Sequence, residues 1–146
     1  MRLLLLVHLA ATLFMVGVIW FVQIVHYPLF SRVGEGGFAR YSQAHSRLTG
    51  LVVGPPMLVE AATAVALAVS PPQGVPFVLP LLGLGLLAVV WLSTAFLQSP
   101  QHGVLGRGFV ADSHHQLVAS NWIRTLCWTA RGAVVLAMAR VLLPPA

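Results

Sequence analysis

Four long apolar stretches, nearly free of charged residues, constrain this chain of 146 residues more than any other feature. About 20 consecutive apolar residues are enough for a helix to cross the hydrocarbon core of a bilayer. In that core only helices and closed barrels satisfy every backbone polar group. The pattern therefore predicts an all-α, polytopic membrane protein in which a four-helix transmembrane bundle forms a single domain over residues 1–146. The expected spans are residues 3–25, 48–69, 77–98 and 117–139.

Composition and charge exclude several other classes of protein. Only 8% of the residues are charged and 58% are hydrophobic, whereas about a quarter of the residues of an average soluble domain are charged. The net charge of +5 comes from arginines that stand singly between apolar stretches, so the sequence lacks the basic clusters that bind nucleic acid. The single cysteine, Cys127, excludes an internal disulfide and a Cys-x-x-Cys metal or redox motif.

The polar connections between the spans indicate how the bundle is oriented. Ser31–Arg47 and Ser99–Gln116 are separated by two spans, so they lie on one side of the membrane and both termini lie on the other. The arginines on the two sides are Arg32, Arg40, Arg47 and Arg107 against Arg2 and Arg140. The positive-inside rule therefore favours a multi-pass protein of the cell inner (plasma) membrane, with these two connections in the cytoplasm.

Two local patterns add detail to this arrangement. Within the first connection, Phe38, Tyr41 and Leu48 fall on one helical face. This spacing predicts a short amphipathic helix over Gly34–Leu48 that lies in the membrane interface and covers the mouth of a pocket, with residues 108–116 as its counterpart. In the second span, the adjacent Pro55 and Pro56 predict a kink.

The chain matches itself weakly at an offset of 71 residues. Trp20 falls on Trp91, and a Gly-Phe-x-x-x-Ser pattern begins at Gly37 and again at Gly108. Alanine and valine matches arise easily by chance in apolar sequence, but an aligned tryptophan and a shared pattern in both long connections do not. We therefore expect two tandem helical hairpins related by a pseudo-twofold axis along the membrane normal.

The spans contain three charged residues, Glu60, Arg124 and Arg131. Charges at membrane depth face the bundle interior and pair with one another, and the repeat offset places Glu60 opposite Arg131. Glu60 is therefore either a structural ion-pair partner of Arg131 or Arg124, or a carboxylate that handles a proton or contacts a ligand. One positive charge is left over. Either one arginine reaches an interface, or the interior receives an anionic or electron-rich molecule.

Polar and aromatic side chains line single faces of three predicted helices. The sets are Trp20, Gln23 and Tyr27 in the first helix, Trp91, Thr94 and Gln98 in the third, and Asn121, Arg124, Trp128 and Arg131 in the fourth. Tryptophans near span ends also serve as interfacial anchors, which is the alternative for Trp20 and Trp91. Three such faces predict an internal pocket, in which these side chains contact a substrate.

Five of the six histidines fall near one membrane face, whereas His8 lies toward the other end of the first span. His26, His45, His102 and His115 come from four segments and are candidate ligands for iron, copper or haem. No ligand-pair spacing such as His-x-x-x-His is present, so a protein without any metal is the alternative. In either case His26 is a candidate base.

The last span carries an Asn-x-x-Arg-Thr motif at Asn121–Thr125, and the first span ends in His26-Tyr27-Pro28. Both segments resemble the anthrone-oxygenase-like family of small four-helix integral membrane proteins. The resemblance implies an oxygenase that acts on a hydrophobic aromatic molecule such as an anthrone. It also implies catalytic roles for Asn121, Arg124 and His26.

Three functions are compatible with these patterns. The first is a membrane oxidoreductase or oxygenase for a lipophilic, ionisable substrate that is aromatic or quinone-like. A histidine or Glu60 would remove a proton, and Arg124 with Asn121 would stabilise the resulting oxyanion. The second is a non-catalytic small subunit or assembly factor that binds lipid, quinone or haem, as a homo-oligomer or within a larger membrane complex. The third is a small-molecule transporter.

Overall fold

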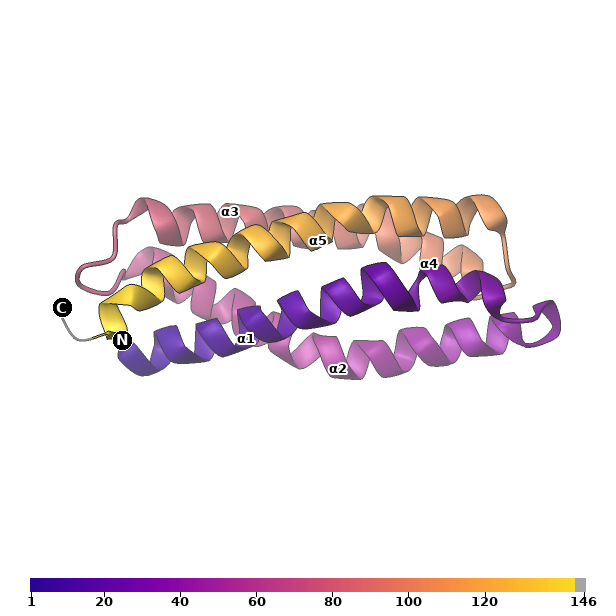
Figure 1. The fold of residues 1–146 in the computed structure, drawn as a ribbon, viewed down its shortest axis with the longest axis horizontal. Helices are drawn as coiled ribbons and strands as arrows, with labels where there is room; N and C mark the ends of the chain where they lie inside the picture. The colour runs from indigo at the N-terminus through magenta and orange to yellow at the C-terminus, as the bar shows by residue number, and fades with distance from the viewer. Residues whose placement is uncertain (144–146) are drawn as a thin grey trace.

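The computed structural model describes residues 1–143, and these residues form a bundle of four helical segments (Figure 1). The first segment is α1 (Arg2–Phe21), followed by a π-helical turn (Val22–His26) and a 3-10 turn (Pro28–Arg32). The second is α2 (Glu35–Val69). The third is α3 (Val78–Ser93), a second π-helical turn (Thr94–Gln98) and α4 (Ser99–Leu105). The fourth is α5 (Ala111–Ala139), which ends in a 3-10 turn (Arg140–Leu142).

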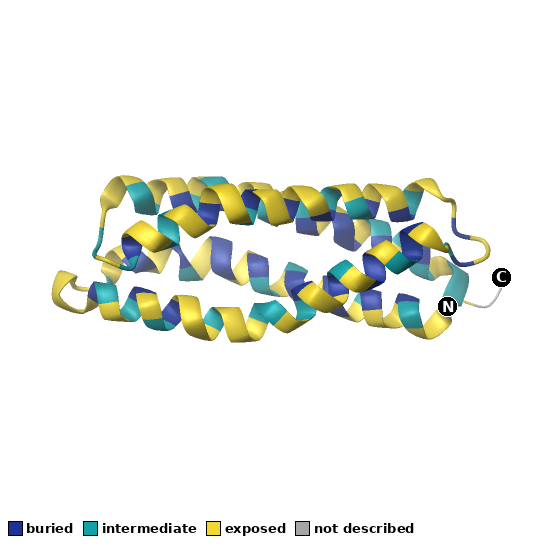
Figure 2. Ribbon diagram, turned by 180° about the vertical axis from the view of Figure 1, so that it is seen from behind, coloured by how far each residue is buried: buried dark blue, intermediate teal, exposed yellow. Residues whose placement is uncertain are grey.

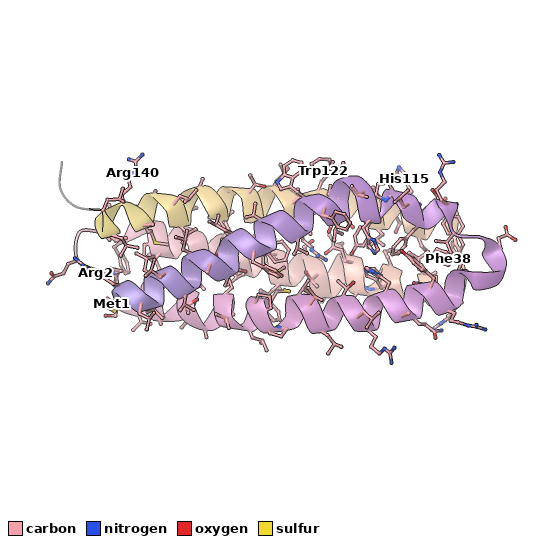
Figure 3. The ribbon with its side chains drawn as sticks, turned by 60° about the horizontal axis from the view of Figure 1, so that its bottom comes forward. Met1, Arg2, Phe38, His115, Trp122 and Arg140 are labelled. Atoms are coloured by element: carbon pink, nitrogen blue, oxygen red, sulfur yellow. The ribbon has the colours of Figure 1, made fainter. Side chains whose placement is uncertain are left out.

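All four segments are long and apolar enough to cross a membrane, which confirms the predicted number of spans. Helix α1 packs beside α2 and α5, and α3 packs beside the same two helices. Consequently α1 and α3 lie on one diagonal of the bundle, and α2 and α5 lie on the other. The start of α1, the end of α5 and the α2–α3 connection lie at one end, and the other two connections lie at the opposite end, as predicted (Figure 1). Arg2 and Arg140 project at the terminal end (Figure 3).

The two long connections expected from the sequence are mostly helical, and this corrects the prediction. Helix α2 begins at Glu35 and continues without a break through Leu48, so residues 34–48 are not a separate interfacial helix. The physical reason is that Phe38, Ser42 and His45 are buried on a stripe that continues into the bundle. Pro55 and Pro56 lie within α2 and do not end it. The kink predicted at these prolines stays a prediction.

Buried side chains run along the inner faces of the helices, while the outer faces are apolar and exposed (Figure 2). Leu3, Phe96 and Val69 are 73%, 72% and 80% exposed. Large contiguous apolar surfaces are rare on soluble monomers. The buried polar side chains, by contrast, include Glu60, Asn121 and others inside the bundle. Such an inside-out distribution is what four helices in a bilayer require.

The two halves of the chain repeat the same order of elements. In each half a long helix passes into a π-helical turn, then into a short helical piece with a proline, and then into a long returning helix. Two pairs of residues that are 71 positions apart also touch. The rings of Phe38 and Phe109 lie 5.0 Å apart between centroids, and Arg131 Nη2 lies 2.9 Å from Glu60 Oε1. Equivalent residues meet in this way only near the axis that relates the halves, which favours the predicted pseudo-twofold arrangement.

Candidate functional site

The centre of the bundle is held by a buried ion pair between α2 and α5. Glu60 Oε1 accepts hydrogen bonds from Arg131 Nε at 3.1 Å and from Arg131 Nη2 at 2.9 Å. The other carboxylate oxygen, Oε2, accepts from Trp128 Nε1 at 3.0 Å, and Arg131 Nη1 donates to the carbonyl of Gly83. Glu60 is fully buried and Arg131 is almost so. The predicted pairing with Arg131 is therefore confirmed, and both groups are occupied structurally.

Arg124 carries the positive charge that this pair leaves over. Its guanidinium carbon lies 5.5 Å from the centroid of the Trp128 ring, in a cation–π arrangement. The only salt bridge among residues 1–143 joins Arg131 to Glu60, so the described residues supply no carboxylate for Arg124. Its Nε is buried and has no hydrogen-bond partner within this part of the chain. A guanidinium in this position is open to an anionic ligand.

Arg124 lines a cavity of about 300 Å³, called here the Arg124 cavity. Helix α2 contributes much of its wall, and Tyr27, Thr94, α4 and α5 complete it. Its lining residues are Tyr27, His45, Ser46, Thr49, Gly50, Val53, Met57, Thr94, Ser99, His102 and Arg124. Of the first-helix face that was predicted to line the pocket, the cavity includes Tyr27 but neither Trp20 nor Gln23. The cavity lies instead on the inner side of α2, and Arg124 reaches it from the diagonally opposite helix.

A difference between the two halves of the repeat explains why the space is on the α2 side. At the α1–α5 seam, Asn121 Nδ2 and Thr125 Oγ1 donate to Gln23 Oε1 at 2.9 and 3.3 Å. Gln23 Nε2 in turn donates to the carbonyl of Val118 at 3.2 Å. The repeat offset puts glycines, Gly50 and Gly54, where this network has Asn121 and Thr125. A Cβ added at Gly50 would meet no atom within 4 Å.

The imidazoles of three histidines and the phenol of one tyrosine lie close together at the end of the cavity nearest the connections. They belong to His26, His45, His102 and Tyr27. His26 Nε2 and His45 Nδ1 share a hydrogen bond of 2.7 Å, and Thr49 Oγ1 lies 3.1 Å from the same His45 nitrogen. Tyr27 Oη and His102 Nε2 are 2.9 Å apart. The rings of His45 and His102 stack with centroids 5.4 Å apart. His102 Nδ1 is buried without a partner in residues 1–143, so it is free to exchange a proton with a ligand.

The four-histidine metal site considered from the sequence is not assembled. His115 is exposed and lines a different surface hollow, whereas its neighbour His114 bonds the carbonyl of Tyr27 at 2.8 Å. Among the described residues no group of three His, Cys, Asp or Glu side chains is arranged to hold a metal ion. His26 and His45 bond directly to each other, which leaves no room for an ion at about 2.0 Å from both nitrogens. The described residues therefore do not form the predicted four-histidine site for iron or copper, and haem binding stays a prediction.

Several predicted contact residues lie outside the cavity. Trp20 is 37% exposed, donates through Nε1 to Thr129 Oγ1 at 3.0 Å, and meets the edge of Trp122. Trp91 is 40% exposed. Both tryptophans lie on the outer surface, which favours the anchor alternative. The shared face predicted for Trp20, Gln23 and Tyr27 assumed a regular α-helix, whereas the π-helical turn that begins at Val22 changes the rotation per residue.

The remaining predicted site residues have mainly structural partners. Gln98 accepts a hydrogen bond from Ser93 at 3.0 Å and donates to Ser120 at 3.0 Å. Asn121 is fully buried in the Gln23 network, one helical turn from Arg124. Sequence reasoning gave His45 and His102 a metal-binding role only, and it missed Ser46, Gly50 and Ser99. The signal that could have identified them is the run of small residues on one face of α2, at Ser46 and Gly50.

No protein-family model matches this chain, and neither a curated protein nor a solved structure matches it. The resemblance of the Asn121–Thr125 segment to anthrone oxygenases therefore stays an expectation. The functional proposals that follow depend on the Arg124 cavity and on the surfaces around it.

Proposed function

We propose that this chain is a multi-pass membrane protein that binds a lipophilic, ionisable aromatic or quinone-like molecule in the Arg124 cavity. The single observation that supports this most strongly is the guanidinium of Arg124, which is partly buried and lines a cavity without a carboxylate among the described residues. An unpaired charge away from water is costly. An anionic oxygen of the ligand would remove that cost and would gain a bidentate, charge-assisted hydrogen bond.

The membrane setting follows from the four spanning-length helices and their apolar outer faces. We place the protein in the cell inner (plasma) membrane. The two connections at the end that carries Arg32, Arg40, Arg47 and Arg107 would face the cytoplasm, as the excess of arginines there favours. A lipophilic ligand then reaches the cavity from the bilayer, where it is already concentrated.

The side chains around the cavity have distinct roles in this proposal. Arg124 binds the oxyanion, and the Trp128 ring beneath the guanidinium holds it in place. His102 Nδ1 is the base, since it lines the cavity and has no partner in the described chain. Tyr27 hydrogen-bonds the other nitrogen of His102 and fixes the orientation of the ring. Glu60 and His26, the bases considered from the sequence, are already occupied by Arg131 and His45.

The reaction that this arrangement supports is oxygenation of an enolisable carbon. His102 takes a proton from the ligand, and Arg124 stabilises the enolate or phenolate that results. Dioxygen is the oxidant and reacts at the carbanionic carbon. For an anthrone, the ring CH₂ becomes a carbonyl with one oxygen atom. The second oxygen atom leaves as water with the two hydrogens, so atoms and electrons balance.

A binding protein without catalysis is the second candidate. It is favoured by the hydrogen bond between His26 and His45 and by the ion pair of Glu60. These interactions occupy the two named candidate bases, Glu60 and His26, and leave only His102 Nδ1 as a buried, unpartnered imidazole nitrogen among the described residues. In this case the same cavity holds a quinone or an aromatic acid, and dioxygen is not consumed.

The test uses the full chain, purified in detergent, and the acidic hydroxynaphthoquinone lawsone, whose visible absorbance reports its ionisation. Arg124→Gln should weaken lawsone binding about tenfold or more, because a hydrogen bond to a charged group contributes about 1.5–3 kcal/mol. Arg124→Lys should lose part of the affinity, since it keeps the charge but not the planar fork. The matched control is Arg140→Gln at the opposite end of the bundle, which should leave binding unchanged. Equal affinity of the wild type and Arg124→Gln would overturn the proposal.

Dioxygen uptake separates the two candidates. With a dihydroxyanthrone as substrate, the oxygenase predicts steady dioxygen uptake that His102→Asn abolishes while lawsone binding is retained. The binding protein predicts no uptake above buffer in the wild type.

A further inference from the structure

We propose that the apolar groove between α1 and α2 binds the hydrocarbon tail of the molecule whose ionisable ring occupies the Arg124 cavity. The ligand would thus be an amphiphile, with an acidic aromatic or quinone-like ring and a long apolar chain. This inference rests on the proposed function, and it adds the class of ligand and its route of entry.

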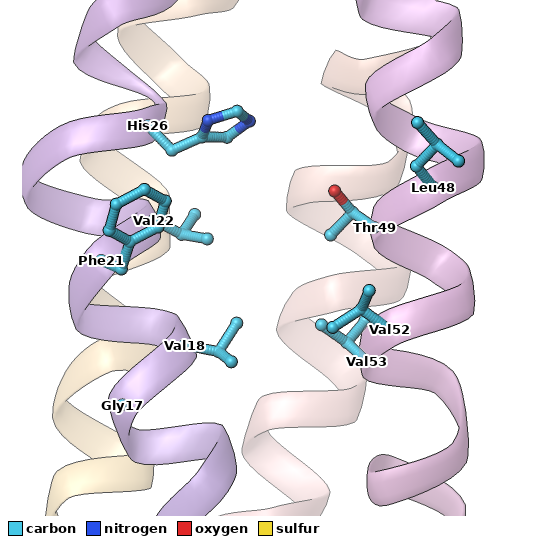
Figure 4. A pocket seen from close by; sticks show the side chains of 9 residues that line it. All are labelled: Gly17, Val18, Phe21, Val22, His26, Leu48, Thr49, Val52 and Val53. Carbon is cyan, nitrogen blue, oxygen red and sulfur yellow. The ribbon is translucent and has the colours of Figure 1, made fainter.

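The groove has a volume of about 440 Å³ and opens on the outer surface of the bundle. Figure 4 shows Val18, Phe21 and Val22 on one wall, and Leu48 and Val52 on the other. Phe21, Leu48 and Val52 are each more than half exposed, so the groove faces the hydrocarbon of a surrounding bilayer. Its lining is suited to an alkyl or isoprenoid chain, because the lining is almost entirely apolar and a chain that fills the groove gains dispersion contacts with both walls.

Gly17 gives the groove its depth. A Cβ added at Gly17 would meet nothing within 4 Å, and Gly17 lies at the end of the groove farthest from His26 (Figure 4). The stretch from Gly17 in α1 to His26 at the end of the π-helical turn spans about 13 Å at roughly 1.5 Å per residue. An extended chain of about ten carbons is of similar length.

The groove and the Arg124 cavity share two lining residues, Thr49 and Val53 of α2. These side chains therefore form the wall between the two hollows. His26 lines the groove, His45 lines the cavity, and their rings are joined by the hydrogen bond of 2.7 Å. A ligand that spans both hollows would pass the His26–His45 pair, with its chain among the groove valines and its charged ring toward Arg124. The shared wall with the cation-bearing cavity is the reason that we assign the groove to the ligand tail rather than to a membrane lipid.

The test compares lawsone with the same headgroup carrying an undecyl chain, measured by absorbance titration on the full chain in detergent. In the wild type the tailed compound should bind at least about tenfold more tightly than lawsone. Gly17→Leu places a side chain in the groove. It should remove most of that advantage and leave lawsone binding unchanged. The matched control is Gly85→Leu on α3, another exposed helical glycine with nothing within 4 Å of an added Cβ.

A second pair of variants guards against misfolding at Gly17. Val52→Trp should fill the groove from α2, whereas Leu51→Trp, one residue away and 69% exposed, should not. The groove proposal is overturned if the tail brings no added affinity, or if the groove variants bind the tailed compound as well as their controls do. If the groove variants bind the tailed compound as well as their controls do, the groove binds membrane lipid only. Failure of the cavity proposal looks different, because Arg124→Gln would then leave the affinities of both compounds unchanged.

Discussion

The indole of Trp128 joins Arg124 to Glu60: its ring lies 5.5 Å from the Arg124 guanidinium carbon, while its Nε1 donates to Glu60 Oε2 at 3.0 Å. The binding cation and the structural ion pair are therefore mechanically linked through one buried side chain. Trp128 is fully buried, so its position is fixed by the packing around it. The affinity of the Arg124 cavity for an anion then depends also on the contact between Trp128 and Glu60, which lies outside the cavity.

Substitutions of Trp128 should separate its two functions. Trp128→Phe removes the hydrogen bond to Glu60 but keeps an aromatic face, so we expect a loss of stability of about 1–3 kcal/mol with near-normal lawsone binding. Trp128→Leu also removes the cation–π contact, which contributes about 0.5–2 kcal/mol, and should weaken binding further. Denaturation in detergent and absorbance titration measure the two effects. If the Phe variant binds as poorly as the Leu variant, the ring is not what supports Arg124.

Removal of the charge on Glu60 should destabilise the bundle strongly. Glu60→Gln leaves the Arg131 guanidinium buried without a counter-charge, at a cost of about 3–5 kcal/mol. The double variant Glu60→Gln with Arg131→Met should recover part of this loss. Glu35→Gln, an exposed position at the start of α2, is the control and should change stability by no more than about 0.5 kcal/mol. A Glu60→Gln protein as stable as the wild type would contradict the structural role of the pair.

Filling the Arg124 cavity from α2 should abolish binding while the fold survives. Gly50→Asn puts at Gly50 the side chain that its repeat equivalent Asn121 already has, and an added Cβ meets open space there. Asparagine is also a slightly better helix former than glycine, so thermal stability should be equal or higher. Gly36→Asn in the first turn of α2 is the control. Retained lawsone affinity in Gly50→Asn would place the ligand elsewhere.

The membrane arrangement predicts accessibility from opposite sides at the two ends of the bundle. Single cysteines at Arg107→Cys and Arg140→Cys, introduced with Cys127→Ser, should react with a membrane-impermeant maleimide from opposite faces of sealed vesicles. The single span α5 separates them, and the proposed cytoplasmic side of the connections predicts labelling of Arg140→Cys in right-side-out vesicles and of Arg107→Cys in inverted ones. Labelling of both positions from the same face would exclude the four-span arrangement.

The parts of this structure that were predictable are those governed by burial alone. The four spans follow from the thickness of a bilayer, and the Glu60–Arg131 pair follows from the repeat offset together with the cost of an unpaired charge. The offset placed Glu60 opposite Arg131, which was one of the alternatives that the sequence left open, and the structure shows that pair. The same offset aligned Gly37-Phe38 with Gly108-Phe109, and the two phenylalanines do touch.

What could not be predicted depends on local backbone geometry and on empty space. The π-helical turns at Val22–His26 and Thr94–Gln98 have no sequence signal that reveals the wider turn, so a regular 3.6-residue period misplaced Trp20. The polar start of α2 resembled a connection, because the partners that bury Phe38 and His45 are distant in sequence. The cavity arises because Gly50 has no side chain. Whether neighbouring side chains fill the space beside a glycine can be determined only from the three-dimensional structure.

The ion pair at the axis has a consequence for how a bundle of this kind is encoded. A symmetric dimer of one helical hairpin would carry the same residue at both axial positions, as two carboxylates or two guanidinium groups facing each other. Like charges at such a distance repel strongly in a medium of low dielectric. Opposite charges can occupy these positions only when the two hairpins differ in sequence, as the two halves of this chain do. The same divergence lets Asn121 fill one seam of the bundle while Gly50 leaves space at the other.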